Sequence, residues 1–159
     1  MKSIFVSCLS VAALACSCSN SGQSQAASQN AGDSIQAQTA VVLDGQWQIE
    51  NIVVNDTLNV RPSEETPDRI SYITFDNGNY SIMTNCNSIQ GSYTLTGDSI
   101  TMNSGLCTEM ACDNMRVEDM IKKVLPEIRT VDMANDSTMR LNSAASEYIV
   151  LSRIKEPIK

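Results

Sequence analysis

The chain has 159 residues, and its 18 acidic and 11 basic side chains give a net charge of −7. An acidic protein repels nucleic-acid phosphates and anionic lipid surfaces, so we exclude nucleic acid as a partner. The sequence contains no histidine, which removes the commonest general base, the nucleophile pairs that need imidazole, and zinc sites built on it.

The amino terminus is typical of a lipoprotein signal peptide. Lys2 supplies a short positive region, and residues 4–15 form an apolar segment too short to span a bilayer as a permanent helix. The segment ends in small residues directly before Cys16, a pattern that resembles a lipobox. We therefore predict that residues 1–15 are removed and that Cys16 is lipidated. Cys18 is the alternative lipidation site, and ordinary cleavage that leaves a soluble periplasmic protein is the remaining alternative.

The lipidated cysteine and a flexible tether are expected to occupy residues 16–40. The tether is rich in Ser, Gln, Ala and Asn, and it holds too little apolar surface to offset its chain entropy. Ser34, between Asp33 and Ile35, resembles the acceptor residue of a bacterial O-glycosylation tripeptide. Because Ser17 rather than Asp follows Cys16, we expect the lipid-anchored protein of the cell envelope to be sorted to the outer membrane. No acidic cluster follows Cys16, so we expect the domain to face the periplasm.

A single domain of short strands is predicted for residues 41–159. Trp47 and Ile49 share one face of the first strand, and a long loop with Glu64 and Glu65 follows. These two carboxylates are interpreted as a solvated loop rather than a general acid/base pair. Asn77-Gly78 is a strong hairpin signal. Further strands are predicted at 70–75, 80–84, 89–95 and 99–102.

One amphipathic helix interrupts the strands. Asp113 is its expected N-cap and Pro126 ends it, and its apolar stripe consists of Val117, Met120, Ile121 and Val124. Three more strands follow at 129–133, 138–141 and 147–153. The fold class is therefore mainly β (α+β), with a curved antiparallel sheet of seven or eight strands and one helix.

Three motifs carry a resemblance to a known family. They are an opening Leu-x-Gly-x-Trp, an Asn-Cys-Asn run leading into Gly-x-Tyr, and a Thr-x-Met-Ala-Cys run before the helix. Their residues are Leu43, Gly45, Trp47, Asn85, Cys86, Asn87, Gly91, Tyr93, Thr108, Met110, Ala111 and Cys112. Over residues 43–153 the order resembles the META domain, the module of HslJ-type bacterial heat-shock lipoproteins. The family usually has Gly at the position of Asn85, and Asn is the residue that best replaces Gly in a left-handed backbone.

The resemblance implies a barrel-like sheet with the helix packed across an opening. It also favours a disulfide between Cys86 and Cys112, the cysteines of the two later motifs. If Cys16 is lipidated and Cys8 is removed, four cysteines remain, and the sequence alone permits three pairings of them. Cys107 would then be a free thiol or the partner of Cys18. In another interpretation, Cys86 and Cys112 are simply small buried hydrophobic residues.

The function implied by the resemblance is non-enzymatic: support of stress or antibiotic tolerance through contacts with an unknown envelope protein. No phosphate-binding loop or nucleophile elbow appears, so we predict no catalytic residue and no cofactor, and we expect a monomeric domain anchored to the membrane by lipid. One alternative is a barrel that binds a small apolar ligand, because large aromatic side chains are few. Another alternative is a Cu(I) site formed by Met110, Cys112 and Met115.

Overall fold

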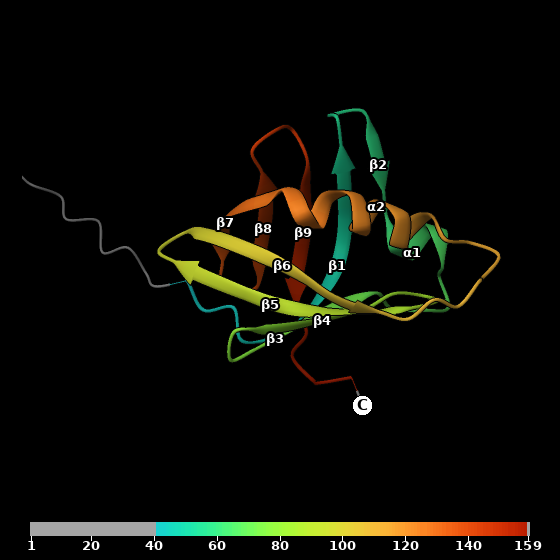
Figure 1. Cartoon of the computed structure of the whole chain (residues 1–159), viewed down its shortest axis with the longest axis horizontal. Helices are drawn as coiled ribbons and strands as arrows, with labels where there is room; N and C mark the ends of the chain where they lie inside the picture. The colour runs from blue at the N-terminus through green and yellow to red at the C-terminus, as the bar shows by residue number, and fades with distance from the viewer. Residues whose placement is uncertain (1–40, 159) are drawn as a thin grey trace, which may run out of the picture. The chain divides into compact units, whose positions relative to one another are not determined.

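The computed structural model describes residues 41–158 (Figure 1). The predicted signal peptide and tether, the two candidate lipidation sites Cys16 and Cys18, and the candidate glycosylation site Ser34 lie outside the described residues. Within the described range, no helix is long and apolar enough to cross a membrane.

Nine strands of the described part of the chain form one antiparallel sheet. The elements in chain order are β1 Gly45–Val54, β2 Leu58–Val60, α1 Pro62–Glu65, β3 Tyr72–Asp76, β4 Asn79–Met83, β5 Ser88–Thr96, β6 Ser99–Cys107, α2 Arg116–Val124, the 3-10 helix η1 Leu125–Glu127, β7 Ile128–Asn135, β8 Thr138–Ser143 and β9 Tyr148–Arg153.

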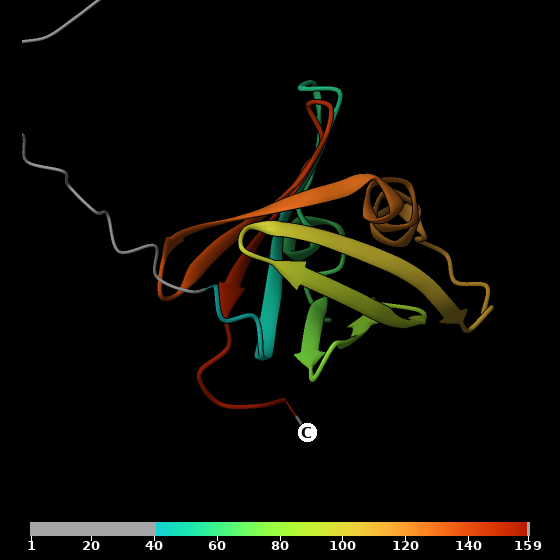
Figure 2. The same cartoon turned by 60° about the vertical axis from the view of Figure 1, so that its left-hand side comes forward.

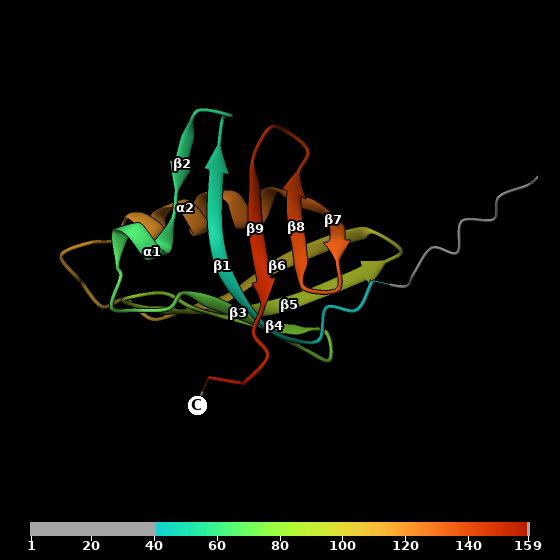
Figure 3. The same cartoon turned by 180° about the vertical axis from the view of Figure 1, so that it is seen from behind.

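The sheet closes into a barrel through β1. One edge of β1 pairs with β9, and the first half of its other edge pairs with β3. The ring therefore runs β1-β3-β4-β5-β6-β7-β8-β9, and β2 lies outside it, paired only with the end of β1 (Figures 1 and 3). A register shift between Ile49 and Asn51 adds the bend that closure requires. The predicted barrel-like sheet with one principal helix is confirmed.

The weakest seam of the barrel lies between β6 and β7. A single residue pair, Ser99 with Thr130, joins these two strands. By contrast, β5 and β6 pair from Ile89 opposite Cys107 to Thr96 opposite Ser99. Helices α2 and η1 lie beside the part of β6 whose second edge has no strand partner (Figures 1 and 2). The buried stripe of α2, namely Val117, Ile121 and Val124, completes the core there.

Side chains fill the interior of the barrel. Trp47 is fully buried, Phe75 is 1% exposed, and both belong to a single apolar cluster drawn from all the long strands. The indole Nε1 of Trp47 donates a hydrogen bond to the carbonyl oxygen of Leu43 at 2.7 Å. The guanidinium of Arg153 stacks 4.0 Å above the Trp47 ring. The opening motif is therefore a packing unit that fixes where the chain enters β1.

Three local predictions differ from the structure. The expected long loop contains β2 and the one-turn helix α1, which begins at Pro62 because proline fits the first helical position. Strand β6 continues to Cys107, beyond the predicted end at residue 102. Helix α2 begins at Arg116 instead of directly after Asp113, and the backbone N–H of Arg116 is bound by the side-chain oxygen of Asn114.

Substituting Gly91 by Ala tests the packing of β5. A Cβ at this position would collide with the backbone oxygen of Asn103 and would lie 2.5 Å from the hydroxyl of Tyr80. We expect Gly91→Ala to lower the free energy of unfolding by about 1–3 kcal/mol, the usual cost of overpacking. Urea unfolding measures this change, and exposed Ser92→Ala is the matched control. Equal midpoints for the two variants would contradict the close approach of β5 and β6.

Candidate functional site

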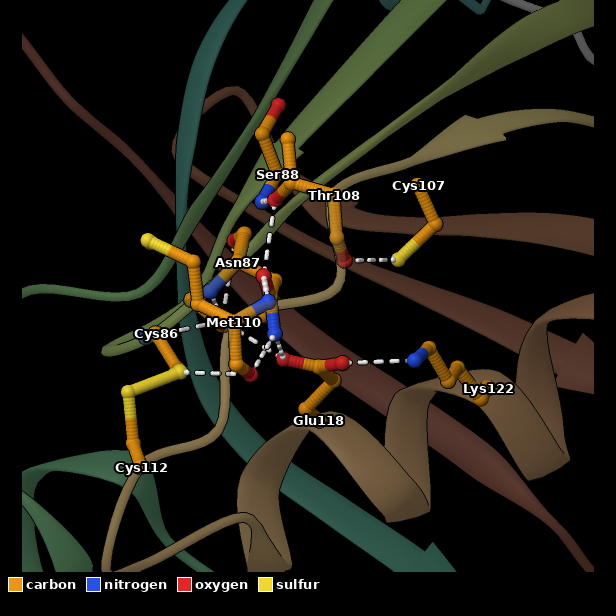
Figure 4. A network of polar contacts seen from close by, with 10 residues as sticks. Cys86, Asn87, Ser88, Cys107, Thr108, Met110, Cys112, Glu118 and Lys122 are labelled. Carbon is orange, nitrogen blue, oxygen red and sulfur yellow. Dashed lines mark hydrogen bonds and ion pairs between the residues drawn. A yellow bond between two sulfur atoms is a disulfide. The ribbon is translucent and has the colours of Figure 1, made fainter.

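The two cysteine motifs meet at one end of the β5–β6 hairpin (Figure 4). Cys86 lies in the turn between β4 and β5, and Cys112 lies in the irregular segment between β6 and α2. The two residues form a disulfide, with their α carbons 6.0 Å apart across 26 positions of sequence. The pairing favoured by the family resemblance is therefore present.

Asn87 uses all four hydrogen-bonding positions of its side-chain amide. Its Nδ2 donates to the carbonyl oxygen of Met110 at 3.0 Å and to Oε2 of Glu118 at 2.9 Å. Its Oδ1 accepts from Oγ1 of Thr108 and from the backbone N–H of Met110, both at 2.8 Å. Because an amide offers two donors and two lone pairs, this side chain is fully satisfied. It joins the β4–β5 turn, the 108–112 segment and helix α2.

Glu118 is a fully buried carboxylate on the inner face of α2. Besides Asn87, its partners are Lys122, whose Nζ lies 2.6 Å from Oε1, and Thr84, whose hydroxyl lies 3.4 Å from Oε2. The pKa of Lys122 is raised, first because its ammonium donates a hydrogen bond to Glu118, an effect that partial burial opposes. A buried charge is tolerated only when it is paired and hydrogen-bonded, as Glu118 is.

Thr84 closes the turn that carries Cys86 and Asn87. Its hydroxyl oxygen accepts hydrogen bonds from the backbone N–H groups of Cys86 at 3.1 Å and Asn87 at 2.8 Å, and the hydroxyl donates to the carbonyl oxygen of Asn87 at 2.9 Å. We call Thr84, Asn87, Thr108, the Met110 backbone and Glu118 the polar staple. These groups bind one another, and two of them bind a neighbour as well: Glu118 pairs with Lys122, and the hydroxyl of Thr108 accepts from the backbone N–H of Ser88. The polar staple therefore holds three segments of the fold together.

The sequence interpretation missed Glu118, Thr84 and Lys122. The apolar stripe expected for the helix does not include Glu118. The position of Glu118 was nevertheless informative, since it lies three residues before Ile121 and seven before Leu125, on the face that packs inward. A carboxylate in that helical phase, with Lys122 four residues later, indicates a buried carboxylate paired with a half-exposed lysine.

Gly45 and Tyr93, two further motif residues, have structural roles. Gly45 has a φ of +123°, and a Cβ there would lie 3.0 Å from the Arg153 guanidinium. The ring of Tyr93 packs edge-on against Phe75 at 5.2 Å. Burial, followed by the nearby charge of Asp44, raises the pKa of Tyr93. Ala111 is exposed, and nothing in the structure explains its place in the motif.

Two expectations for these motifs are wrong. Positive φ among the described non-glycine residues occurs at Asn55, Asp56 and Asn77, so Asn85 does not adopt the left-handed backbone expected of it. Its side chain instead donates to the carbonyl oxygen of Asn114 at 2.7 Å. The copper hypothesis loses its anionic ligand, because the sulfur of Cys112 is oxidised in the disulfide and no thiolate is available.

The third cysteine of the described range forms no disulfide with another residue of that range. Within residues 41–158, Cys107 is a half-buried free thiol at the end of β6, and its sulfur donates to the carbonyl oxygen of Thr108 at 3.1 Å. A pairing with Cys18 lies outside the described residues. Between residues 41 and 158, no group of three or more His, Cys, Asp or Glu side chains is arranged to hold a metal ion.

Comparison with known proteins identifies the family and the fold. The family model of the META domain matches residues 39–156, and no curated protein matches the chain. An NMR structure of a protein from Burkholderia xenovorans has a TM-score of 0.61 at 20% identity, covering 72% of this chain and 85% of that chain. The crystal structure of a DUF4847 family protein from Bacteroides vulgatus has a TM-score of 0.51 at 15% identity, covering 72% and 96% respectively. At these identities, the structures show a shared fold.

Removing the disulfide should destabilise the domain without changing its fold. Replacing Cys86 and Cys112 together by Ser frees a loop of 26 residues, and loop entropy then predicts a loss of about 3 kcal/mol in the free energy of unfolding. Chemical denaturation with and without reductant measures the loss. Cys107→Ser is the matched control and should stay within about 0.5 kcal/mol of the wild type. Peptide mapping that found Cys107 linked to Cys112 would contradict the assignment.

Proposed function

The chain belongs to the META domain family, and on that premise we propose that it is a non-enzymatic, lipid-anchored protein of the bacterial cell envelope. In this proposal it supports stress or antibiotic tolerance by binding another envelope protein. The anchor is Cys16, and the domain faces the periplasm from the outer membrane. Two or three acyl chains on one cysteine would hold the domain at a membrane far longer than one chain can.

One observation carries the non-enzymatic part of the proposal: the two cysteine motifs use the polar groups of Asn87, Thr108 and Met110 to form the polar staple. General acid/base catalysis needs a titratable group within reach of a substrate. Glu118 is the one fully buried carboxylate among the described residues, and its oxygens already bind Asn87 and Lys122. The polar groups of these motifs therefore stabilise the fold. In this proposal, other molecules bind to the surface of the domain instead.

The filled interior favours a protein partner over a ligand held inside the barrel. Trp47, Phe75 and the aliphatic side chains of the opposing strands close the space that such a ligand would need. The small-ligand alternative therefore has support only at the surface of the domain. Contacts between proteins also use the surface, and they agree with the role that the family resemblance implies.

Complementation in the native bacterium tests the proposal. We expect a strain that lacks the protein to survive heat or antibiotic stress less well than its parent, and the wild-type gene to restore survival. Cys16→Ser should remove acyl labelling and fail to restore survival, because the folded domain is no longer held at the membrane. Cys18→Ser is the matched control and should keep both the label and the phenotype. Full restoration by unlabelled Cys16→Ser would refute the anchored role.

A further inference from the structure

A groove of about 1190 Å³ opens at the end of the β5–β6 hairpin opposite the polar staple. Its walls are the β5–β6 turn at Gly97 and Asp98, the end of β7 at Met133, and the first described residues, Val41 and Val42. Figures 2 and 3 show the segment at residue 41 running past the tips of the β5–β6 and β7–β8 hairpins. Barrel closure thus brings together three parts of the chain that are distant in sequence.

The floor of the groove is apolar. Val131 is buried, and Val41, Leu95 and Met133 are partly buried against the core cluster. Val42 is 59% exposed, although it is a large hydrophobic residue at the groove wall. An apolar surface that remains open in a concave site is typical of a place where another apolar group binds.

The rim of the groove is acidic. Asp98, Asp132 and Asp136 line it, and all three are exposed. Asp132 has a distant ion pair with Arg140 at 3.6 Å. Asp98 and Asp136 take part in none of the ion pairs found within residues 41–158. Two carboxylates at the rim are therefore available to a cation.

Arg153, the cationic residue that lines the groove, is already engaged. Its guanidinium donates to the backbone oxygens of Val42 at 3.1 Å, Asp44 at 3.1 Å and Asp136 at 3.2 Å. Its flat face covers Trp47. Arg153 thus fixes the wall of the groove and has few donors left for an anionic ligand.

From this complementarity we propose that the groove binds a basic amphipathic peptide segment of another envelope protein. Apolar side chains of the segment lie on Val42, Leu95 and Met133, and its Lys or Arg side chains meet Asp98 and Asp136. The volume exceeds the roughly 300–1000 Å³ of usual small-molecule pockets, which favours a peptide. This inference rests on the proposed role in protein contacts and names the surface and the partner chemistry for it.

Fluorescence anisotropy with defined peptides tests the site. The full-length protein, purified from its own envelope into nanodiscs of zwitterionic lipid, is titrated into labelled octapeptides of alternating Leu and Lys, Leu and Glu, or Ser and Lys, with empty nanodiscs as the blank. We expect the Leu/Lys peptide to bind at least tenfold more tightly than the other two. Added salt should weaken it, because exposed charges are screened.

Two variants with equal charge change separate the groove from general electrostatic attraction. Asp98→Asn with Asp136→Asn should weaken Leu/Lys binding roughly five- to tenfold, as expected for two exposed ion pairs. Asp68→Asn with Glu109→Gln removes the same charge at exposed positions outside the groove and should leave binding nearly unchanged. Equal weakening by both variants, or equal binding of all three peptides, would overturn the proposal.

A photoreactive residue in place of Val42 identifies the occupant directly. We expect benzoylphenylalanine at this position to cross-link the Leu/Lys peptide, with less cross-linking when unlabelled peptide competes. Cross-links to residues 17–40 of the same chain or to a second copy would overturn the proposal. These assays measure peptide binding and do not measure survival under stress. If they fail, the groove proposal is wrong, while the complementation experiment still decides the proposed function.

Discussion

The side-chain amide of Asn87 is the interaction on which the rest of the domain depends. The barrel has one weak seam, where β6 and β7 share a single residue pair and diverge. Helix α2 must be held beside that seam, yet the 108–115 segment that leads to it has no regular hydrogen-bond ladder of its own. Asn87 supplies the missing bonds to this segment and to Glu118, and the Cys86–Cys112 disulfide adds a covalent link at the same place. A buried polar network of this kind stabilises a fold only when every member is satisfied.

The strands and the main helix could be predicted from local patterns. Asn77-Gly78 takes positive φ at both positions and turns β3 into β4, as its composition indicates. The apolar stripe of α2 places Val117, Ile121 and Val124 in the core. By contrast, β2 has only three residues, and it forms because Val60 is buried beside the end of β1. Such tertiary pairing leaves no periodic signal.

The candidate sites were predictable to different degrees. The Cys86–Cys112 link followed from the family resemblance, whereas residue spacing alone left three pairings open. The helical spacing of Glu118 from Ile121 and Leu125 indicates that its side chain is buried. Its partner Asn87 lies 31 positions away, however, and only the folded chain brings the two together. The groove had no sequence signal, because Val42, Asp98 and Asp136 meet through barrel closure. The two cysteine motifs and the proposed binding surface thus occupy opposite ends of the β5–β6 hairpin, so these motifs identify the fold without locating the partner.

Native-state hydrogen exchange of Asn87→Ala, with the disulfide intact, tests the central claim most directly. The account predicts that amide protection falls most in α2 and the 108–112 segment, while the β7–β8 hairpin keeps protection close to that of the wild type. Exposed Asn103→Ala provides the comparison on the same sheet. A uniform loss across all elements, or unchanged protection in α2, would show that Asn87 does not hold the helix to the barrel.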